Sequence, residues 1–311
     1  MKLVSIVIPC YNSSKTIKNV VNDIMQKFDS IPNYDVQIIL VDDFSPDQTY
    51  LTIKEICDNN KYVQGLRLSR NYGQAAARMA GMNYVKGDII LCMDDDGQHP
   101  VEQIPNMIQE IENGADIVYA HFIKKETTLF KKITSRITRK IYELLQIIPP
   151  NIYVSSYFAI NGKYRAQIQQ YKSPYPSIGT YLYQYTAKFK NIEMVQKERI
   201  AGKSGYHLNK LVNLFLNTIT NFSIIPIRFM LWVGITSIML SLLWFIVLLI
   251  AALLKINIAN GFSIMAGIIA LFCSILLLAV SIVGEYIVRM YILISGKPQF
   301  SIDFTIEAEN K

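Results

Sequence analysis

The chain has 311 residues, a formal net charge of +7 and a hydrophobic content of 51%. Such a composition excludes a disordered, uniformly polar chain, and it directs attention to the places where apolar residues concentrate. The basic residues gather in amphipathic segments without interleaved exposed aromatics, so we predict no nucleic-acid partner.

The first part of the chain alternates strand-like and helix-like segments. We predict strands at residues 3–8, 36–41, 65–68, 89–93 and 116–119. We predict helices at residues 16–27, 48–59, 74–85 and 101–113. This alternation predicts an α/β domain with a Rossmann-like, mostly parallel sheet, in which ligands bind beyond the carboxyl ends of the strands.

The first two predicted strands end in polar and aromatic residues. Pro9, Tyr11 and Asn12 follow the first strand, and the segment 42–49, with Asp43 near its start, follows the second. A carboxylate here can accept a hydrogen bond from a ribose hydroxyl or a base N–H, and an aromatic ring can stack on the base. Ordinary turns are the alternative, with Asp47 as a cap of the next helix.

The fourth strand ends in the acidic segment 93–100 (Met-Asp-Asp-Asp-Gly-Gln-His-Pro). Adjacent carboxylates repel one another unless a cation offsets the cost. On an extended segment Asp94, Asp96 and Gln98 would point to one side and offer three oxygen ligands to Mg²⁺ or Mn²⁺. A solvated acidic turn is the alternative, and His99 either joins the metal or caps the following helix.

Two later segments have the pattern of amphipathic helices. In residues 128–148 apolar positions recur at helical spacing, and the cations between them predict a face toward anionic lipid and the acceptor. These cations include Lys131, Lys132, Arg136 and Arg139. A second stripe occupies the juxtamembrane segment 206–227. Packing on the sheet is the alternative for either segment.

The segments 228–255 and 261–294 predict a transmembrane hairpin. Residues 232–254 and 262–284 each contain 23 residues without a charge, and about 20 suffice to cross a bilayer. Two spans return the chain to its starting side, and cations flank the outer ends of the pair. We therefore predict a plasma (inner) membrane protein whose catalytic domain (1–205), tail (295–311) and termini are cytoplasmic.

The motifs that start at Pro9, Val41, Arg70 and Met93, in this order and spacing, resemble the family-2 glycosyltransferases with a GT-A fold. More closely, the chain resembles dolichyl- and undecaprenyl-phosphate sugar transferases, including bactoprenol glucosyltransferases with two C-terminal spans. The resemblance implies that the metal and the diphosphate bind at Asp94, Asp96 and Gln98. The residues that it implies for the nucleotide sugar are Pro9, Tyr11, Asn12, Ser13, Val41, Asp43, Arg70 and Asp95.

The segment 199–206 resembles the family's basic motif. The resemblance implies that Arg199 and Lys203 meet phosphate groups and that Ser204 helps to position them. Cations of this kind neutralise the charge that grows on a departing diphosphate. For Lys203, a contact with lipid headgroups is the alternative.

The chain lacks Asp and Glu between Glu143 and Glu193, and this narrows the class of acceptor that we expect. A hydroxyl acceptor needs a carboxylate base, whereas a phosphate, whose second pKa is about 6, is already anionic at neutral pH. We therefore expect inverting transfer of one hexose to a phosphate acceptor. The resemblance implies that this acceptor is a polyprenyl (undecaprenyl) phosphate and that the donor is UDP-glucose. The alternatives are a transferase with a hydroxyl or glycan acceptor, and a non-catalytic membrane scaffold.

Two departures from the family pattern concern the acceptor and the first strand. Many relatives have an acidic residue where this chain has Ser13, and an aspartate in the region that reads Val-Ser-Ser-Tyr-Phe from residue 154. Ser155, Ser156 or Tyr157 would then take the place of that aspartate, or the acceptor differs. Small residues along both predicted spans are compatible with a homo-oligomer such as a tetramer.

Overall fold

The structure is a computed structural model that describes residues 1–123, 150–173, 176–197, 261–294 and 298–306, with a few single positions elsewhere. The predicted segments 128–148, 206–227 and 228–255 lie outside the described residues, apart from such single positions. The chain divides into two compact units, residues 1–218 with 297–311, and residues 219–296. Each unit is treated by itself below.

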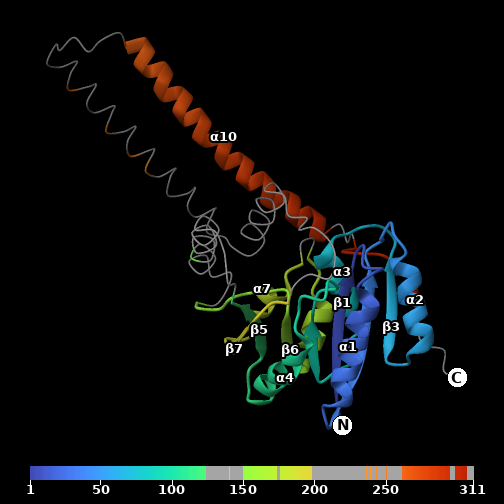
Figure 1. Ribbon diagram of the computed structural model, residues 1–311. Helices are drawn as coiled ribbons and strands as arrows, with labels where there is room; N and C mark the ends of the chain where they lie inside the picture. Colours follow the sequence, from blue (N-terminus) through green and yellow to red (C-terminus); the bar gives the residue numbers. More distant parts are fainter. Residues whose placement is uncertain are drawn as a thin grey trace. The chain divides into compact units, whose positions relative to one another are not determined.

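Among the described residues, eight strands form one sheet in the order β7-β5-β6-β4-β1-β2-β3-β8 (Figure 1). The strands are β1 (Lys2–Cys10), β2 (Tyr34–Asp42), β3 (Val63–Leu68), β4 (Ile89–Cys92), β5 (Ile117–Phe122), β6 (Phe158–Asn161), β7 (Phe189–Met194) and β8 (Ile302–Ile306). The five predicted strands are therefore confirmed, with shifts of a few residues at their ends.

Strands β3, β2, β1 and β4 run parallel to one another. Strands β6 and β8 are antiparallel to their neighbours, so the sheet is mixed although mostly parallel. The chain winds outward from β1 through β2 to β3 and then crosses to β4 on the other side of β1. This reversal of strand order is the point at which open α/β sheets bind ligands.

The helices of the first unit are α1 (Ile17–Asp29), α2 (Thr49–Asn59), α3 (Gln74–Met82), η1 (Val101–Gln103), α4 (Ile104–Glu112), η2 (Gly162–Tyr164), α6 (Arg165–Gln170) and α7 (Ile178–Leu182). The four predicted helices are confirmed; α3 ends earlier than expected, and η1 precedes α4. In α1 the buried positions Ile17, Val20, Val21, Ile24 and Phe28 form one stripe. This spacing of three or four residues is why the segment folds as a helix against the sheet.

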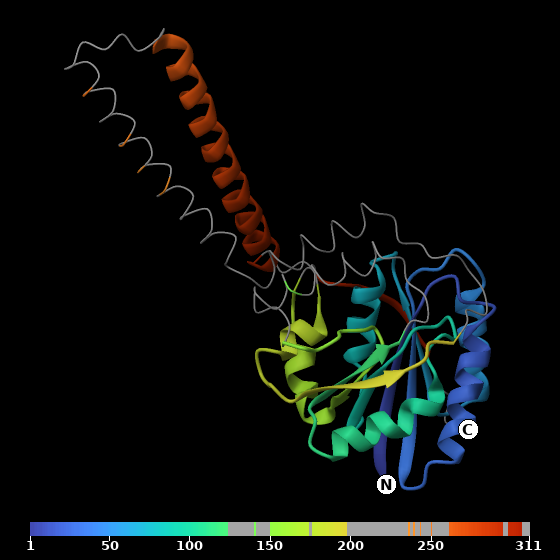
Figure 2. The same ribbon diagram turned by 60° about the vertical axis from the view of Figure 1, so that its left-hand side comes forward.

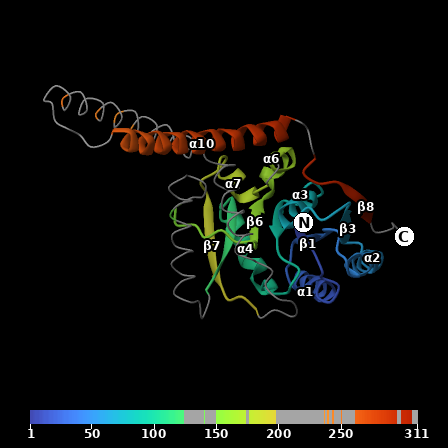
Figure 3. The same cartoon turned by 90° about the horizontal axis from the view of Figure 1, so that it is seen from above.

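The sheet is covered on both faces, as Figure 3 shows with α1 and α2 on one side and α3 and α6 on the other. One large cluster of buried apolar residues joins the sheet to α1, α2 and α4. All of β1 from Val4 to Cys10 is buried, as expected for a central parallel strand with helices on both faces. The carboxyl ends of these strands are thus held by a rigid core.

The two edges of the sheet are late segments of the first unit. Strand β7, yellow in Figure 2, forms one edge beside β5. The other edge is β8, which pairs antiparallel with β3. This strand, which we did not predict, lies in the segment 295–311 that we expected to be a tail. The end of the chain therefore completes the sheet after residues 219–296.

The second unit contains helix α10 (Gly261–Ile294), which has the bounds that sequence analysis gave to the second apolar helix. Within the part of the chain that the structure describes, no helix is both long and apolar enough to cross a membrane.

Candidate active site

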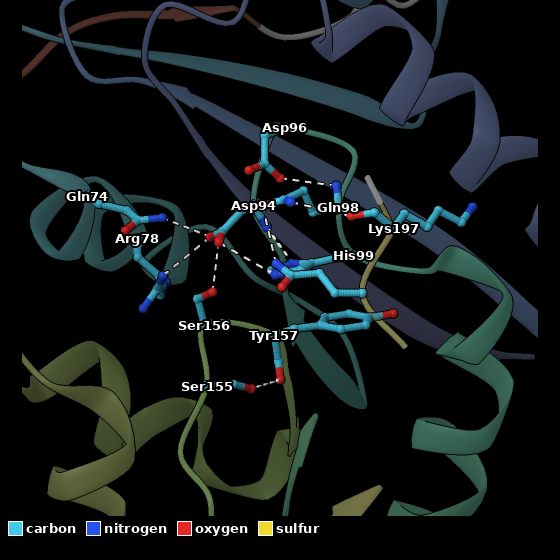
Figure 4. Close-up of polar contacts among 11 residues, drawn as sticks. Gln74, Arg78, Asp94, Asp96, Gln98, His99, Ser155, Ser156, Tyr157 and Lys197 are labelled. Carbon is cyan, nitrogen blue, oxygen red and sulfur yellow. Dashed lines mark hydrogen bonds and ion pairs between the residues drawn. The ribbon is translucent and has the colours of Figure 1, made fainter. Parts of the chain in front are cut away.

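Asp94 stands just beyond the end of β4, at the centre of a cluster of polar side chains (Figure 4). Its Oδ1 atom accepts a hydrogen bond of 2.8 Å from the Gln74 amide. Its Oδ2 atom accepts one of 2.7 Å from the Ser156 hydroxyl. The Arg78 guanidinium is 3.8 Å from Oδ1. Residues from α3, from the β4 end and from the segment before β6 therefore meet at one carboxylate.

His99 contacts both the backbone and the carboxylate of Asp94. Its Nδ1 atom accepts a hydrogen bond of 2.9 Å from the Asp94 backbone N–H, and its Nε2 atom is 3.5 Å from Asp94 Oδ2. The ring stacks between Phe122 and Tyr157, with centroid distances of 5.5 and 4.7 Å. Burial lowers the pKa of His99, so the ring is neutral near pH 7.

From the sequence we expected His99 either to join the metal or to cap the following helix. The capping alternative is wrong, because the following helix η1 begins after Pro100 and has no side-chain cap. His99 instead fixes the backbone of Asp94, and a neutral imidazole with its proton on Nε2 fits both contacts.

Asp95 points in a different direction, toward the loop after β1. It accepts a hydrogen bond of 3.0 Å from the Tyr11 backbone N–H and another from the Ser13 hydroxyl. Burial raises the pKa of Asp95 to about 6, although these hydrogen bonds act to lower it. The three adjacent aspartates are thus divided between two tasks, and Asp95 ties the β4 end to the β1 end.

Asp96 and Gln98 lie on a bend rather than on an extended segment. The chain bends at residues 95–97 and Gly97 has a φ of 73°, a conformation that glycine adopts without strain. The Gln98 N–H donates to Asp96, while the Gln98 amide contacts the backbone carbonyl of Lys197 and the side chain of Gln196. The expectation of an extended segment with three aligned ligands is therefore wrong.

The metal expectation can be tested against these donors. Among the described residues, no group of three or more His, Cys, Asp or Glu side chains could hold a metal ion. However, Mg²⁺ is usually bound through one or two carboxylates plus substrate phosphates. Asp94, just before the bend at the strand end, and Asp96, within it, fit that incomplete set. The Gln98 amide is engaged with residues 196 and 197.

The loop after β2 is fixed through its own aspartates. Asp43 accepts backbone hydrogen bonds of 2.7 Å from Tyr72 and 2.8 Å from Gly73, and burial raises the pKa of its carboxyl. Asp43 thus joins the β2 end to the loop before α3. Asp47 accepts from the Thr49 N–H at the start of α2, although the N-cap of this helix is Gln48, which has no side-chain cap.

The other residues predicted for the nucleotide sugar lie around these loops. Tyr11 is half-exposed, and the Asn12 N–H donates to Ser45, which links the β1 and β2 ends. The Arg70 guanidinium lies 4.7 Å from the centre of the Tyr72 ring. Pro9 pairs with Val41 in the sheet, and Val41 is fully buried, so its side chain belongs to the core.

Several predicted residues lie outside the described part of the chain, namely Arg199, Lys203, Ser204, Lys131, Lys132, Arg136 and Arg139. Sequence reasoning missed Gln74 and Arg78. The spacing of these two residues, four apart at the start of a helix that follows a glycine, was the available signal. Ser156 was one of three candidates beside the acceptor, and the structure places its hydroxyl against Asp94.

Comparison with known proteins decides the family. The model of glycosyl transferase family 2 matches residues 5–187, more than half of the chain. The chain belongs to this family. It is a glycosyltransferase, and the cluster around Asp94 is its candidate active site.

Named relatives match the glycosyltransferase over nearly its whole length. A bactoprenol glucosyl transferase of Shigella flexneri is 27% identical and covers 96% of this chain and 97% of its own. An undecaprenyl-phosphate 4-deoxy-4-formamido-L-arabinose transferase of Aeromonas hydrophila is 29% identical, covering 97% and 93%. An uncharacterized glycosyltransferase of Bacillus subtilis, YkcC, is also 29% identical, covering 99% and 95%.

A solved structure supports the fold. The glucosyl-3-phosphoglycerate synthase of Mycobacterium tuberculosis, crystallised with Mn²⁺, UDP and phosphoglyceric acid, superimposes with a TM-score of 0.52 and 15% identity. The match covers 70% of this chain and 76% of that one. At this identity the likeness shows a shared GT-A-like α/β fold.

Proposed function

We propose that this glycosyltransferase moves one hexose from a nucleotide diphosphate sugar, UDP-glucose, to a polyprenyl phosphate such as undecaprenyl phosphate. The observation that carries the proposal is the cluster around Asp94, in which the Ser156 hydroxyl donates to the carboxylate. Relatives that match almost the whole chain are named for undecaprenyl phosphate or bactoprenol. A lipid-linked sugar made in this way would serve the modification of cell-surface glycans.

The class of acceptor depends on whether the site contains a base that can take a proton from a hydroxyl. His99 lies buried, and its Nδ1 is occupied by the Asp94 N–H. The sequence has no Asp or Glu between Glu143 and Glu193, and Ser156 cannot act as a base at neutral pH. A phosphate acceptor requires none, because its oxygen is already an anionic nucleophile.

The proposed reaction is a single displacement with inversion. A phosphate oxygen attacks the anomeric carbon, the bond from that carbon to the diphosphate oxygen breaks, and the nucleoside diphosphate leaves with the electron pair. Asp94 and Asp96 would hold Mg²⁺ or Mn²⁺, which would neutralise charge on the diphosphate when bound. Gln74, Ser156 and His99 keep the Asp94 carboxylate oriented for that task.

The basic motif is proposed to assist the leaving group. Arg199 and Lys203 would balance the charge that grows on the diphosphate, with Ser204 as a positioning residue. The segment that leads to this motif is held at the site, since the Lys197 N–H donates to the Gln98 carbonyl. The donor nucleoside would lie between Tyr11 and the loop that begins at Asp43.

Membrane attachment is proposed from the sequence. The uncharged stretches 232–254 and 262–284 support two spans with the catalytic domain, both termini and the substrate site at the cytoplasmic face of the plasma membrane. An even number of spans agrees with the course of the chain, because β8 rejoins the first unit after residues 219–296. The cations of the segment 128–148 would face anionic lipid and the acceptor headgroup.

A transfer assay tests the proposal. The full chain in detergent, with Mg²⁺ or Mn²⁺, undecaprenyl phosphate and a panel of radiolabelled nucleotide sugars, is compared with Asp96→Ala. We expect a lipid-linked product from UDP-glucose with the unaltered chain alone. Transfer only to a hydroxyl or glycan acceptor would overturn the acceptor class, and absence of nucleotide-sugar binding would favour a scaffold.

A further inference from the structure

The last described strand, β8, forms the edge of the sheet beside β3. It pairs with β3 through Gly65 and Ile306, Leu66 and Thr305, and Arg67 and Phe304. The Ser69 N–H donates to the Ser301 carbonyl at 2.9 Å, which continues the pairing toward the carboxyl end of β3. A side chain at Gly65 would meet Ile53 of α2 at 2.8 Å and Ile306 of β8 at 3.2 Å. Helix α2 and the Ile306 side chain of β8 are therefore packed closely against β3 at Gly65.

The Arg67 guanidinium lies against two aromatic rings, and a third ring, that of Phe304, contacts one of them. The guanidinium carbon is 4.5 Å from the Tyr50 ring of α2 and 5.3 Å from the Phe44 ring of the β2 loop. Tyr50 in turn contacts Phe304 of β8, with ring centroids 6.2 Å apart. Flat contacts of this type hold a guanidinium in one orientation. The position of Arg67 thus depends on the C-terminal strand.

Arg67 also lies beside Asp42, at the start of the turn 42–45 that follows β2. Its Nε atom is 3.6 Å from Oδ2 of Asp42, whose side chain is fully buried. Among the described residues neither atom has a hydrogen-bond partner, so each depends on the other for compensation of its charge. The Asp42 Oδ1 atom accepts from the Ser45 N–H and so shapes the turn that presents Asp43.

The turn itself is strained at Phe44, which has a φ of 56°. A bulky residue in this region is an outlier, and such backbone persists only where its surroundings over-determine it. Here the ring has Arg67 on one side and is 44% exposed. Arg67 therefore supports both ends of the turn, through Asp42 and through Phe44.

We propose that β8 is a positioning element for the donor nucleotide: Phe304, through Tyr50 and Arg67, holds the 42–45 turn in the shape that receives the nucleoside. This inference rests on the proposed function, since it assumes that the loop binds a nucleotide. It assigns to strand β8, which follows the apolar unit, an indirect effect on donor affinity. Phe304 acts through other side chains and is a positioning residue.

The experiment compares Phe304→Ala with Thr305→Ala in the full chain. Thr305 is the next residue of the same strand, and alternation along a strand points it to the other face. Phe304→Tyr serves as the rescue variant, because it keeps the ring. UDP binding is measured by calorimetry with Mn²⁺, and initial rates give the KM for the nucleotide sugar and kcat.

We expect Phe304→Ala to weaken UDP binding and raise KM by about three- to tenfold, the size of one aromatic contact. Its kcat and thermal midpoint should stay close to those of Thr305→Ala, and Phe304→Tyr should restore binding. Because Phe304 is 52% exposed, its truncation should not prevent folding. Arg67→Lys, which keeps the charge but loses the flat guanidinium, should weaken UDP binding in the same way.

Two outcomes would overturn the inference. Equal UDP affinity in Phe304→Ala, Arg67→Lys and Thr305→Ala, while the unaltered chain binds UDP, would remove β8 from donor positioning and leave the proposed function intact. A chain that binds no nucleotide at all would overturn both the inference and the proposed function.

Discussion

Asp116, at the amino ends of the parallel strands, and the aspartates at their carboxyl ends differ in how their charge is compensated. Asp116, just before β5 at the amino edge, pairs with Lys163 at 2.5 Å and accepts from the hydroxyls of Tyr164 at 2.9 Å and Thr186 at 2.6 Å. Burial acts to raise the pKa of Asp116, but these hydrogen bonds outweigh it and hold the pKa below its usual value.

At the carboxyl ends of the strands, burial outweighs the effect of hydrogen bonds on the pKa of three aspartates. Burial raises the pKa of Asp42, Asp43 and Asp95 despite their hydrogen bonds. Asp94 accepts from neutral groups of Gln74 and Ser156, and the Arg78 guanidinium stays 3.8 Å away. Carboxylates whose charge the protein leaves incompletely compensated are typical of sites that receive a cationic or polar ligand. The comparison assigns a structural role to Asp116 and a chemical role to the cluster at β4.

The largest effect should come from Asp94→Asn. The change keeps the shape but removes the negative charge, so we expect sugar transfer to fall at least about 100-fold through lost metal and diphosphate binding. Initial rates with saturating acceptor measure the loss. A thermal midpoint close to that of the unaltered chain shows that the fold is kept; transfer within a factor of about three would contradict the assignment.

Asp116→Asn should have the opposite profile, with transfer nearly unchanged and a free energy of unfolding lowered by about 1–3 kcal/mol. Because the folded-state pKa of Asp116 is lowered, its stabilisation is complete above the unfolded pKa and is lost as the pH falls through the folded one. Denaturant unfolding at pH 7 and below about pH 4 should therefore show the difference shrinking on acidification. A difference that grows on acidification would refute this sign.

Ser156→Ala should have the smallest effect, a loss of about tenfold in kcat/KM from one hydrogen bond to a carboxylate. Ser155→Ala is the matched control, because the Ser155 hydroxyl donates to the Tyr157 carbonyl and not to Asp94. Steady-state kinetics of both variants give the comparison. Equal losses would assign the effect to the local backbone rather than to Asp94.

Much of the fold could be predicted because the central strands and helices carry strong periodic signals. The run from Leu3 to Ile8 and the stripe of α1 leave little choice of structure. Strand β8 was missed because five residues at a sheet edge, after a long apolar segment, have no distinctive pattern. Its place depends on long-range pairing with β3, which a single sequence does not display.

The candidate site was predicted in part for the same reason. The aspartates at the strand ends were found, because strand ends in parallel sheets collect ligands. Their division of tasks was not, because the chain bends at residues 95–97 and Asp95 contacts Tyr11 and Ser13 instead of joining Asp94. The roles of Gln74 and Arg78 depend on how α3 packs on β1 and β2, and tertiary packing decides that.

The most direct test of the account is UDP binding by calorimetry to the unaltered chain, Asp94→Asn and Asp116→Asn, each with Mn²⁺ and again with excess chelator. The account predicts binding to the unaltered chain and to Asp116→Asn that the chelator abolishes, and no such binding to Asp94→Asn. Undiminished metal-dependent binding to Asp94→Asn, or its loss in Asp116→Asn alone, would contradict the placement of the donor site at the carboxyl edge.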